Sequence, residues 1–338
     1  MGITEFGAPQ AADGSLISGA GLLARVERGD ITESAHLGHL IILGKDGRTI
    51  LKVGDPNVTI YPRSSLKPLQ LLASLRAGFD PDDEALVALA ASSHNGEPEH
   101  LEGAREILHN IGLDETALDN TPGTPLDPQA AFEWKAQGRE AEAIAQNCSG
   151  KHAAMLAACV ASGWPVAGYR DVEHPLQKLV AATIKELTGD AEPPHITTDG
   201  CGAPLFSTSL VGLARAFGRI ATAPPGTDEA RIAAAMAAHP HMVGGTGRDV
   251  TAAMQAVPGL ICKDGAEGVY AGALADGTAF AFKVLDGSGR PRPAILARVL
   301  ELAGVADLPG VDLAAMREIG TVPVLGHGNP VGLVRPAF

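Results

Sequence analysis

The chain has 338 residues, of which 45% are hydrophobic and 19% charged, and its formal net charge is −13 at pH 7. This composition is typical of a globular protein with a sizeable core. The acidic surplus argues against binding to nucleic acid or to an anionic membrane surface, because both need clustered lysine and arginine. No signal peptide is evident in the first twenty residues, and four cysteines are too few for a disulfide scaffold. We therefore expect a cytoplasmic protein that binds neither nucleic acid nor membranes.

The predicted elements begin with a flexible N-terminal tail at residues 1–22, which are rich in Gly, Ala and Ser and show no periodicity. The apolar run 37–43, a turn signal at 45–47 and the alternating segment 49–53 predict a β-hairpin. Apolar residues at helical spacing then predict helices at 64–75, 84–91, 99–111, 150–161, 175–187, 206–217 and 227–238.

Strand signals return near the C-terminus, at 259–263, 269–274 and 279–285, and a helix is predicted at 292–302. These strands can join the N-terminal hairpin in one antiparallel sheet only if the two ends of the chain meet in space. We therefore predict an α+β, two-layer fold for a single catalytic domain, residues 23–338. Its sheet subdomain, flanked by helices, comprises about 23–62 and 257–338, and its helical lobe about 63–256. The active site is expected in the cleft between them.

The first candidate for chemistry is Ser64-x-x-Lys67, at the start of a predicted helix. Residues three apart share a helix face, so the lysine amine should lie near the serine hydroxyl. A partly desolvated lysine can serve as the base that a serine nucleophile needs. The pair by itself also fits a helix-capping serine followed by a solvated lysine.

Two further motifs support the catalytic interpretation. Ser93-His94-Asn95 follows a predicted helix, and Lys263-Asp264-Gly265 ends a late strand. In order, Ser-x-x-Lys, Ser-x-Asn and Lys-x-Gly are the elements of penicillin-recognising serine enzymes. We therefore expect two Ser–Lys couples in one cleft, Ser64 with Lys67 and Ser93 with Lys263.

The second candidate site combines Cys148, Lys151 and His152 with Asp199 and Cys201. Two thiolates, a carboxylate and an imidazole could hold a soft divalent ion such as zinc. The common Cys-x-x-Cys and His-x-x-x-His spacings are missing, so two buried free cysteines remain an alternative. In a separate glycine-rich loop, Gly245 and Thr246 offer backbone N–H groups to a ligand carboxylate or oxyanion, unless this is an ordinary connection between helices.

Taken together, these segments resemble the asparaginase II family, the Rhizobium etli-type or class 3 L-asparaginases, from about residue 24 to 335. The resemblance rests on Pro62-Arg63-Ser64-x-x-Lys67-Pro68, Ser93-His94-x-x-Glu97, Asn147-Cys148-Ser149-Gly150-Lys151-His152, Thr198-Asp199-Gly200-Cys201 and His239-Pro240-x-Met242-Val243. It implies a fold similar to serine β-lactamases and glutaminases, a homodimer, and hydrolysis of L-asparagine to L-aspartate and ammonia.

The resemblance also implies roles for single residues. Ser64, Lys67, Ser93 and Lys263 inherit the catalytic Ser–Lys couples. One Zn²⁺ per chain is implied at Cys148, Lys151 and Cys201, and substrate contacts are implied at Arg63, His152, Asp199, Gly245 and Thr246. The alternatives are a β-lactamase-like or other amide hydrolase of the same fold, and a non-catalytic protein that binds zinc or an amino acid.

Overall fold

The computed structural model describes residues 15–191 and 194–338. The strands are β1 (Gly21–Arg28), β2 (Ile31–Leu43), β3 (Thr49–Val53), β4 (Thr59–Ile60), β5 (Ile196–Thr198), β6 (Pro204–Phe206), β7 (Thr208–Ser209), β8 (Ile261–Gly265), β9 (Val269–Ala273), β10 (Ala279–Val284), β11 (Val322–Gly326) and β12 (Asn329–Pro336). The α-helices are α1 (Ser15–Ser18), α2 (Lys67–Arg76), α3 (Glu84–Ala90), α4 (Pro98–His109), α5 (Pro128–Ala136), α6 (Ser149–Ala161), α7 (Pro175–Thr188), α8 (Leu210–Ala221), α9 (Asp228–Ala238), α10 (Pro240–Val243), α11 (Asp249–Ala256), α12 (Arg292–Leu302) and α13 (Leu313–Gly320). Three 3₁₀ helices are η1 (Arg63–Leu66), η2 (Glu115–Ala117) and η3 (Val305–Asp307).

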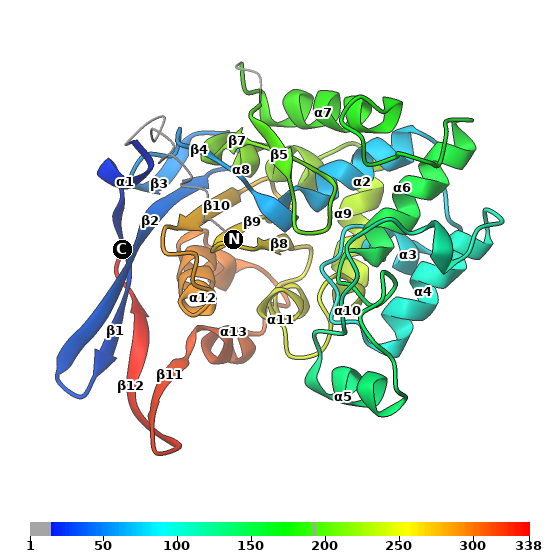
Figure 1. The fold of residues 1–338 in the computed structure, drawn as a ribbon. Helices are drawn as coiled ribbons and strands as arrows, with labels where there is room; N and C mark the ends of the chain where they lie inside the picture. The colour runs from blue at the N-terminus through cyan, green and yellow to red at the C-terminus, as the bar shows by residue number, and fades with distance from the viewer. Residues whose placement is uncertain (1–14, 192–193) are drawn as a thin grey trace, which may run out of the picture.

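The two ends of the chain form one antiparallel sheet, in the order β11-β12-β1-β2-β10-β9-β8, with β3 also paired to β2 (Figure 1). In the central pairing Phe282 lies opposite Leu40, and at the junction of the termini Val334 lies opposite Val26. All residues of β8, β9 and β10 are buried, so both faces of this part of the sheet are covered. The predicted α+β class and the meeting of the chain ends are confirmed.

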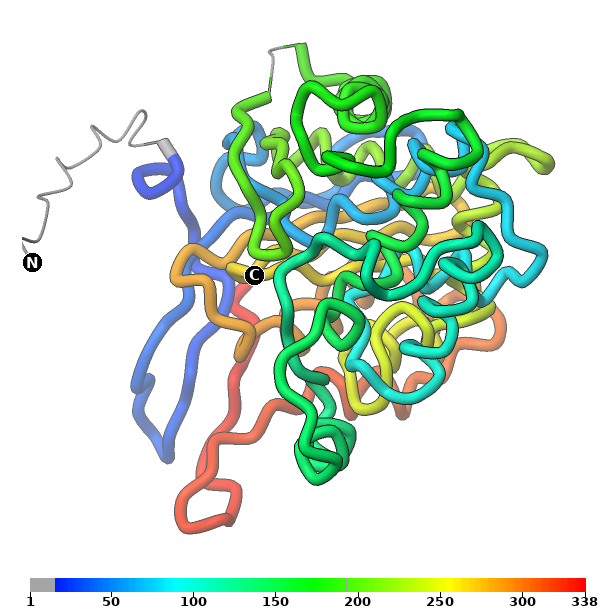
Figure 2. The backbone as a smooth tube through the Cα atoms, turned by 45° about the vertical axis from the view of Figure 1, so that its right-hand side comes forward, coloured from blue at the N-terminus to red at the C-terminus, as the bar shows by residue number. Residues whose placement is uncertain are grey.

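Helices cover the sheet and build the lobe beside it. Helix α8 packs on β10, β9 and β2, while α12 packs on β12 and β1. In the lobe, α2 is surrounded by α6, α7 and α9, and its residues 67–75 are all buried. Figures 1 and 2 show the hairpins β1–β2 and β11–β12 extending away from the lobe at the far side of the sheet.

Several elements differ from the prediction. Strands β1, β11 and β12 and the helices α5, α10, α11 and α13 had no predicted counterpart. The helix expected at 206–217 is α8, which begins later because Ser209 caps it, its hydroxyl accepting the Gly212 N–H, while 204–206 pair as β6 with β5. Of the predicted tail, residues 1–14 lie outside the described residues, and β1 already begins at Gly21.

The start of the lobe is joined to the edge of the sheet by η1, which packs against β8. The Ser65 hydroxyl donates a hydrogen bond to the Lys263 carbonyl oxygen at 3.0 Å. A Cβ atom at Gly265 would lie 2.5 Å from the Pro62 carbonyl oxygen. Only glycine therefore allows η1 to approach the end of β8 this closely.

Among the described helices, none combines the length and apolar character that crossing a membrane requires.

Replacement of Gly265 by alanine should push η1 away from β8. We expect the free energy of unfolding to fall by about 1–3 kcal/mol, as for other overpacked positions, measured by chemical denaturation. Gly289→Ala is the matched control, because the nearest heavy atom to its added Cβ is Arg292 Nε at 3.7 Å, an ordinary contact. Equal stability of the two variants would contradict the close-approach argument.

Candidate active site

Three segments that are distant in sequence meet where η1 packs on β8. The first is η1 with the start of α2, which carries Arg63, Ser64 and Lys67. The second is the loop after α3, where the Ser93 N–H is bonded to the Val243 carbonyl oxygen at 3.1 Å. The third is β8, which carries Lys263. These candidate residues therefore lie at the boundary between lobe and sheet.

Lys67 is fully buried, and its amine is held by the loops around it. Its Nζ donates to the Ser93 Oγ at 3.0 Å, to the Asn147 carbonyl oxygen at 3.4 Å and to the Ser92 carbonyl oxygen. An ammonium group has three donors and needs three acceptors when it is buried. These acceptors direct Lys67 toward Ser93, and among the described residues no hydrogen bond joins Lys67 to the Ser64 hydroxyl.

Lys263 is fully buried and donates to Asp264, both to its carbonyl oxygen, at 2.8 Å, and to its carboxylate. Burial lowers the pKa of Lys263 to about 8; the positive charges of Lys67 and Arg248 act in the same direction, and Asp264 opposes them. Lys67 and Lys263 are thus close enough to repel one another. Within the described residues, Ser93 is hydrogen-bonded to Lys67 and has no such bond to Lys263.

Arg63 and Asp199 form an ion pair, with Arg63 Nε 2.7 Å from Asp199 Oδ1. Arg63 has a φ of +55°, a left-handed conformation that costs a residue with a side chain about 1–2 kcal/mol. Burial alone would raise the pKa of the Asp199 carboxyl, but the charge of Lys151, the Arg63 hydrogen bond and the Gly200 N–H lower it. The ionised carboxylate therefore holds Arg63 in a strained conformation next to Ser64.

The predicted metal ligands come together in a second cluster. Cys148 is the residue that precedes α6, Lys151 lies in the first turn of α6, and Cys201 lies in the turn between β5 and β6. All three are buried, and Lys151 Nζ is 3.2 Å from Cys201 Sγ.

The charges in this cluster are linked. A hydrogen bond from the Cys201 thiol lowers the pKa of Cys148 well below its usual range, helped by Lys67 and Lys151 and opposed by burial. Burial would lower the pKa of Lys151, but the charges of Cys201, Cys148 and Asp199 raise it. Lys151 is an ammonium that donates to Cys201, so it must lose a proton before the two sulfurs and the amine form a donor set that fits a soft ion such as zinc.

His152 lies next to this cluster in α6. Its Nδ1 is 2.7 Å from the Tyr169 hydroxyl, and its buried Nε2 has no hydrogen-bond partner among the described residues. Burial lowers the pKa of His152 well below its usual range, and the charges of Lys151, Lys67 and Arg170 add to the effect. His152 is therefore neutral, and its unpartnered Nε2 is available to a ligand.

Gly245 and Thr246 lie beside the Ser93 loop. The Thr246 N–H donates to Glu97 Oε2 at 3.0 Å, and the Thr246 carbonyl oxygen accepts from Asn95 Nδ2 at 2.9 Å. Gly245 has a φ of +106°, and a Cβ atom there would lie 2.4 Å from Glu97 Oε2. Glycine is required at 245 for both reasons, and Glu97 already uses the Thr246 N–H that the sequence suggested for a ligand.

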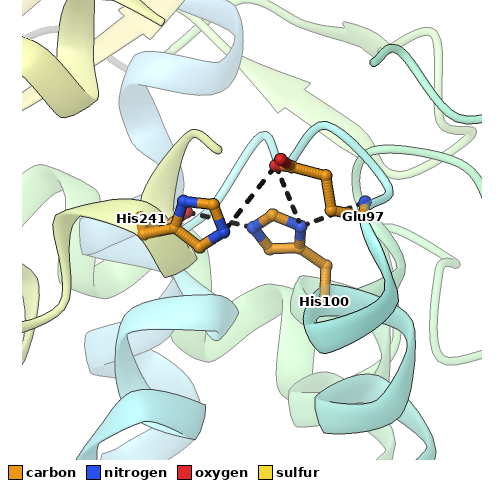
Figure 3. A group of neighbouring side chains, drawn as sticks. All are labelled: Glu97, His100 and His241. Carbon is orange, nitrogen blue, oxygen red and sulfur yellow. Dashed lines mark hydrogen bonds and ion pairs between the residues drawn. The ribbon is translucent and has the colours of Figure 1, made fainter. Parts of the chain in front are cut away.

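A separate group, Glu97, His100 and His241, could hold a metal ion, since one ligand atom of each lies within 4.8 Å of the others (Figure 3). The His100 ring is already committed, because Nδ1 accepts the Glu97 N–H at 3.2 Å and Nε2 lies 3.0 Å from the His241 carbonyl oxygen. An ion at this group would have to displace one of these bonds, and an ion at the cysteine cluster would likewise have to displace the hydrogen bond from Lys151 to Cys201.

Residues whose roles the motifs did not indicate also contribute. Tyr169 orients His152, and Arg248 bonds to the Ser93 carbonyl oxygen, to Asn95 and to Asp264. Arg248 stands at the end of the glycine-rich loop, which is the only sequence signal for it. Two surface cavities of about 400 and 520 Å³ are lined by other residues, around α7 and β7 and between α12 and α13.

The arrangement provides serine hydroxyls, an amine with a lowered pKa and fixed ionic groups in one place. These are the components of nucleophilic acyl transfer, in which a serine attacks a carbonyl carbon and amines manage the protons.

Solved structures to which the chain is similar include a putative β-lactamase from Bacteroides dorei (16% identity, covering 79% of this chain and 93% of that chain, TM-score 0.42) and a β-lactamase from Mycobacterium bovis (13%, 84% and 95%, TM-score 0.44). No curated protein matches the sequence. The sequence profile of the L-asparaginase II family matches residues 24–336. The chain therefore belongs to the L-asparaginase II family.

Proposed function

We propose that this protein is an L-asparaginase, an amidohydrolase that converts L-asparagine to L-aspartate and ammonia. The observation that carries the proposal, beside the family, is the hydrogen bond between the buried Lys67 amine and the Ser93 hydroxyl. The charge of Lys67 also lowers the pKa of the buried Lys263, and burying two lysines that repel one another opposes folding, which supports a catalytic role for them.

Ser64 is proposed as the nucleophile. It is half-buried, whereas Ser93 is only 3% exposed and already bonded to Lys67. The Ser64 oxygen forms a bond to the side-chain amide carbon of asparagine, and the carbon–nitrogen bond breaks. Ser93, bonded to Lys67, is placed to relay a proton to the leaving ammonia. Water then hydrolyses the aspartyl ester and restores Ser64.

The lysines supply the base. Lys67 is the general base of the proposed first couple, and it must lose one of its three hydrogen-bonded protons to act. The positive charge of Lys67 adds to the effect of burial in lowering the pKa of Lys263. The second couple, Ser93 with Lys263, provides a neutral amine that can accept a proton, because the pKa of Lys263 is lowered to about 8.

Binding of the amino-acid end of the substrate is assigned to Arg63, His152, Asp199, Gly245 and Thr246. Arg63 offers a guanidinium to the α-carboxylate, and Asp199 offers a carboxylate to the α-amino group. Each of these two residues already neutralises the other at 2.7 Å. The neutral His152 offers its free Nε2. Such positioning matters because a displacement of about 1 Å can cost a 10²-fold loss in rate.

Cys148, Lys151 and Cys201 are proposed to hold one zinc ion per chain. When bound, the ion supplies a fixed positive charge beside the substrate's amino-acid end. A thiolate held by zinc is not free to attack, so a Cys148–His152 thiol hydrolase is disfavoured.

We also propose a homodimer, which the family resemblance implies, and a cytoplasmic location, which rests on the few cysteines and on the absence of an evident signal peptide from the first twenty residues. Apolar side chains exposed on the two protruding hairpins, Ile31, Leu325 and Val331, are candidate contacts for a second copy.

Loss of the nucleophile should abolish turnover. Ser64→Ala is expected to reduce ammonia release from L-asparagine by at least about 10³-fold, and Ser93→Ala by a smaller factor. In the wild type, added hydroxylamine should divert the acyl-enzyme to aspartyl hydroxamate, a product that Ser64→Ala should not give. Ser92→Ala is the control, because the buried Ser92 hydroxyl has no hydrogen-bond partner among the described residues.

Near wild-type turnover in Ser64→Ala would exclude it as nucleophile. A wild type that releases no ammonia from asparagine but opens a chromogenic β-lactam would favour the β-lactamase-like alternative. No turnover of any amide or lactam would favour a binding protein.

The pH dependence should report Lys263. Because its proton is lost at about pH 8 rather than near 10, kcat should rise as pH increases through about 8 and then level off. Lys263→Met should remove this rising limb of the pH profile of kcat, and most of the turnover. A profile that is flat from pH 6 to 10 would show that Lys263 does not titrate in the reaction.

The two candidate metal sites, the cysteine cluster and the group of Glu97, His100 and His241, can be distinguished because only the first contains sulfur. With Co²⁺ in place of zinc, the wild type should show the sulfur-to-metal charge-transfer absorption of a thiolate site. Cys201→Ser should weaken this band and raise KM more than it lowers kcat. His241→Ala should leave the band unchanged. A band that is absent from the wild type, or lost in His241→Ala, would contradict the assignment to the cysteines.

A further inference from the structure

Arg248 precedes α11, at the end of the glycine-rich loop, and its guanidinium contacts two of the three segments that form the site. One nitrogen, Nη1, donates to the Ser93 carbonyl oxygen at 3.3 Å and to Asn95 Oδ1 at 3.1 Å. The other, Nη2, donates to Asp264 Oδ2 at 2.7 Å. The side chain thus joins the Ser93 loop of the lobe to β8 of the sheet.

Asp264 is surrounded by positive groups. It accepts from Lys263, from Arg248 and, at 3.3 Å, from Arg292, which also lies 3.5 Å from Asp249. Of these three partners only Arg248 also contacts the Ser93 loop among the described residues. An arginine suits this position because its planar fork serves two acceptors in fixed directions, whereas a lysine offers a single nitrogen.

We propose that Arg248 is a positioning residue for the hydrolysis, holding Ser93 and Lys263 at a fixed separation across the boundary between lobe and sheet. The inference rests on the proposed function. Ser93 and Lys263 lie on segments with no strand pairing between them, so their relative placement depends on side-chain contacts such as this one.

Arg248 also acts on Lys263 through charge. The charged groups that face Lys263 are Asp264 on its own strand, Lys67 from α2 and Arg248 from the loop before α11. Arg292 from α12 reaches only as far as Asp264. Loss of the Arg248 charge removes a cation and leaves Asp264 more negative toward Lys263. Both changes raise the pKa of Lys263, so the limb of the pH profile moves to higher pH.

The test compares Arg248→Gln and Arg248→Lys with Arg231→Gln. Arg231 is a matched control: it is 26% exposed against 21% for Arg248, and it likewise bonds to carboxylates and a carbonyl oxygen, those of Asp80, Glu84 and Pro81, away from the site. For each variant, kcat, KM, the pH profile of kcat and the melting temperature are measured with L-asparagine.

We expect Arg248→Gln to lower kcat by about 10²-fold, with little change in KM, and to shift the limb to higher pH. Arg248→Lys should lower kcat less and keep the limb in place, because it retains the charge and loses the fork. Arg231→Gln should change the melting temperature alone.

The inference is overturned if Arg248→Gln keeps kcat within threefold of the wild type, or loses kcat with an unshifted limb. It is also overturned if both Arg248 variants fail to fold, since the residue would then be a structural clamp. A wild type that does not hydrolyse asparagine would instead refute the proposed function, which separates the two failures.

Discussion

Three lysine ammonium groups are buried in the candidate site and in the cysteine cluster, and they must be satisfied there. Lys67, Lys151 and Lys263 are exposed by only 1, 2 and 0%. A charge removed from water costs several kcal/mol unless hydrogen bonds and opposite charges replace the lost hydration. Each lysine therefore requires acceptors, and most of these come from segments distant in the sequence.

The acceptors explain the assembly of the site. Lys67 of α2 is satisfied by the Ser93 loop and by Asn147, Lys151 of α6 by the Cys201 turn, and Lys263 by Asp264, which Arg248 and Arg292 in turn balance. The bonds of Lys67 and of Lys151 each join two elements that are distant in the sequence. These bonds hold segments of the lobe together, and Arg248 joins the lobe to the sheet. The network also holds the Lys67 amine at the Ser93 hydroxyl in a buried environment, where proton affinities shift.

The electrostatics of the site differ from those of the whole chain. The formal net charge is −13, yet cationic side chains outnumber carboxylates among the residues that line the site. An amino-acid substrate carries both charges, and the Arg63–Asp199 pair offers both in return. The left-handed backbone of Arg63 fits this interpretation, because such strain persists where surrounding contacts hold a functional side chain in place.

The sequence by itself determined the class of fold, most of the helices and the strands β2, β3, β8, β9 and β10, and it supplied the candidate residues for the site. Periodicity and turn signals are local, so the hairpin 37–53 and the helices after 80 could be read directly. Strand β1 and the pair β11–β12 were missed, because much of their surface is exposed and their partners lie at the opposite end of the chain. Only the tertiary structure decided which serine each lysine contacts. Spacing along a helix favoured Ser64 for Lys67, but a buried ammonium turns toward the acceptors that surround it, and these belong to the loops before Ser93 and Cys148. The role of Arg248 was hidden for the same reason, since its three acceptors are supplied by segments that no local pattern connects.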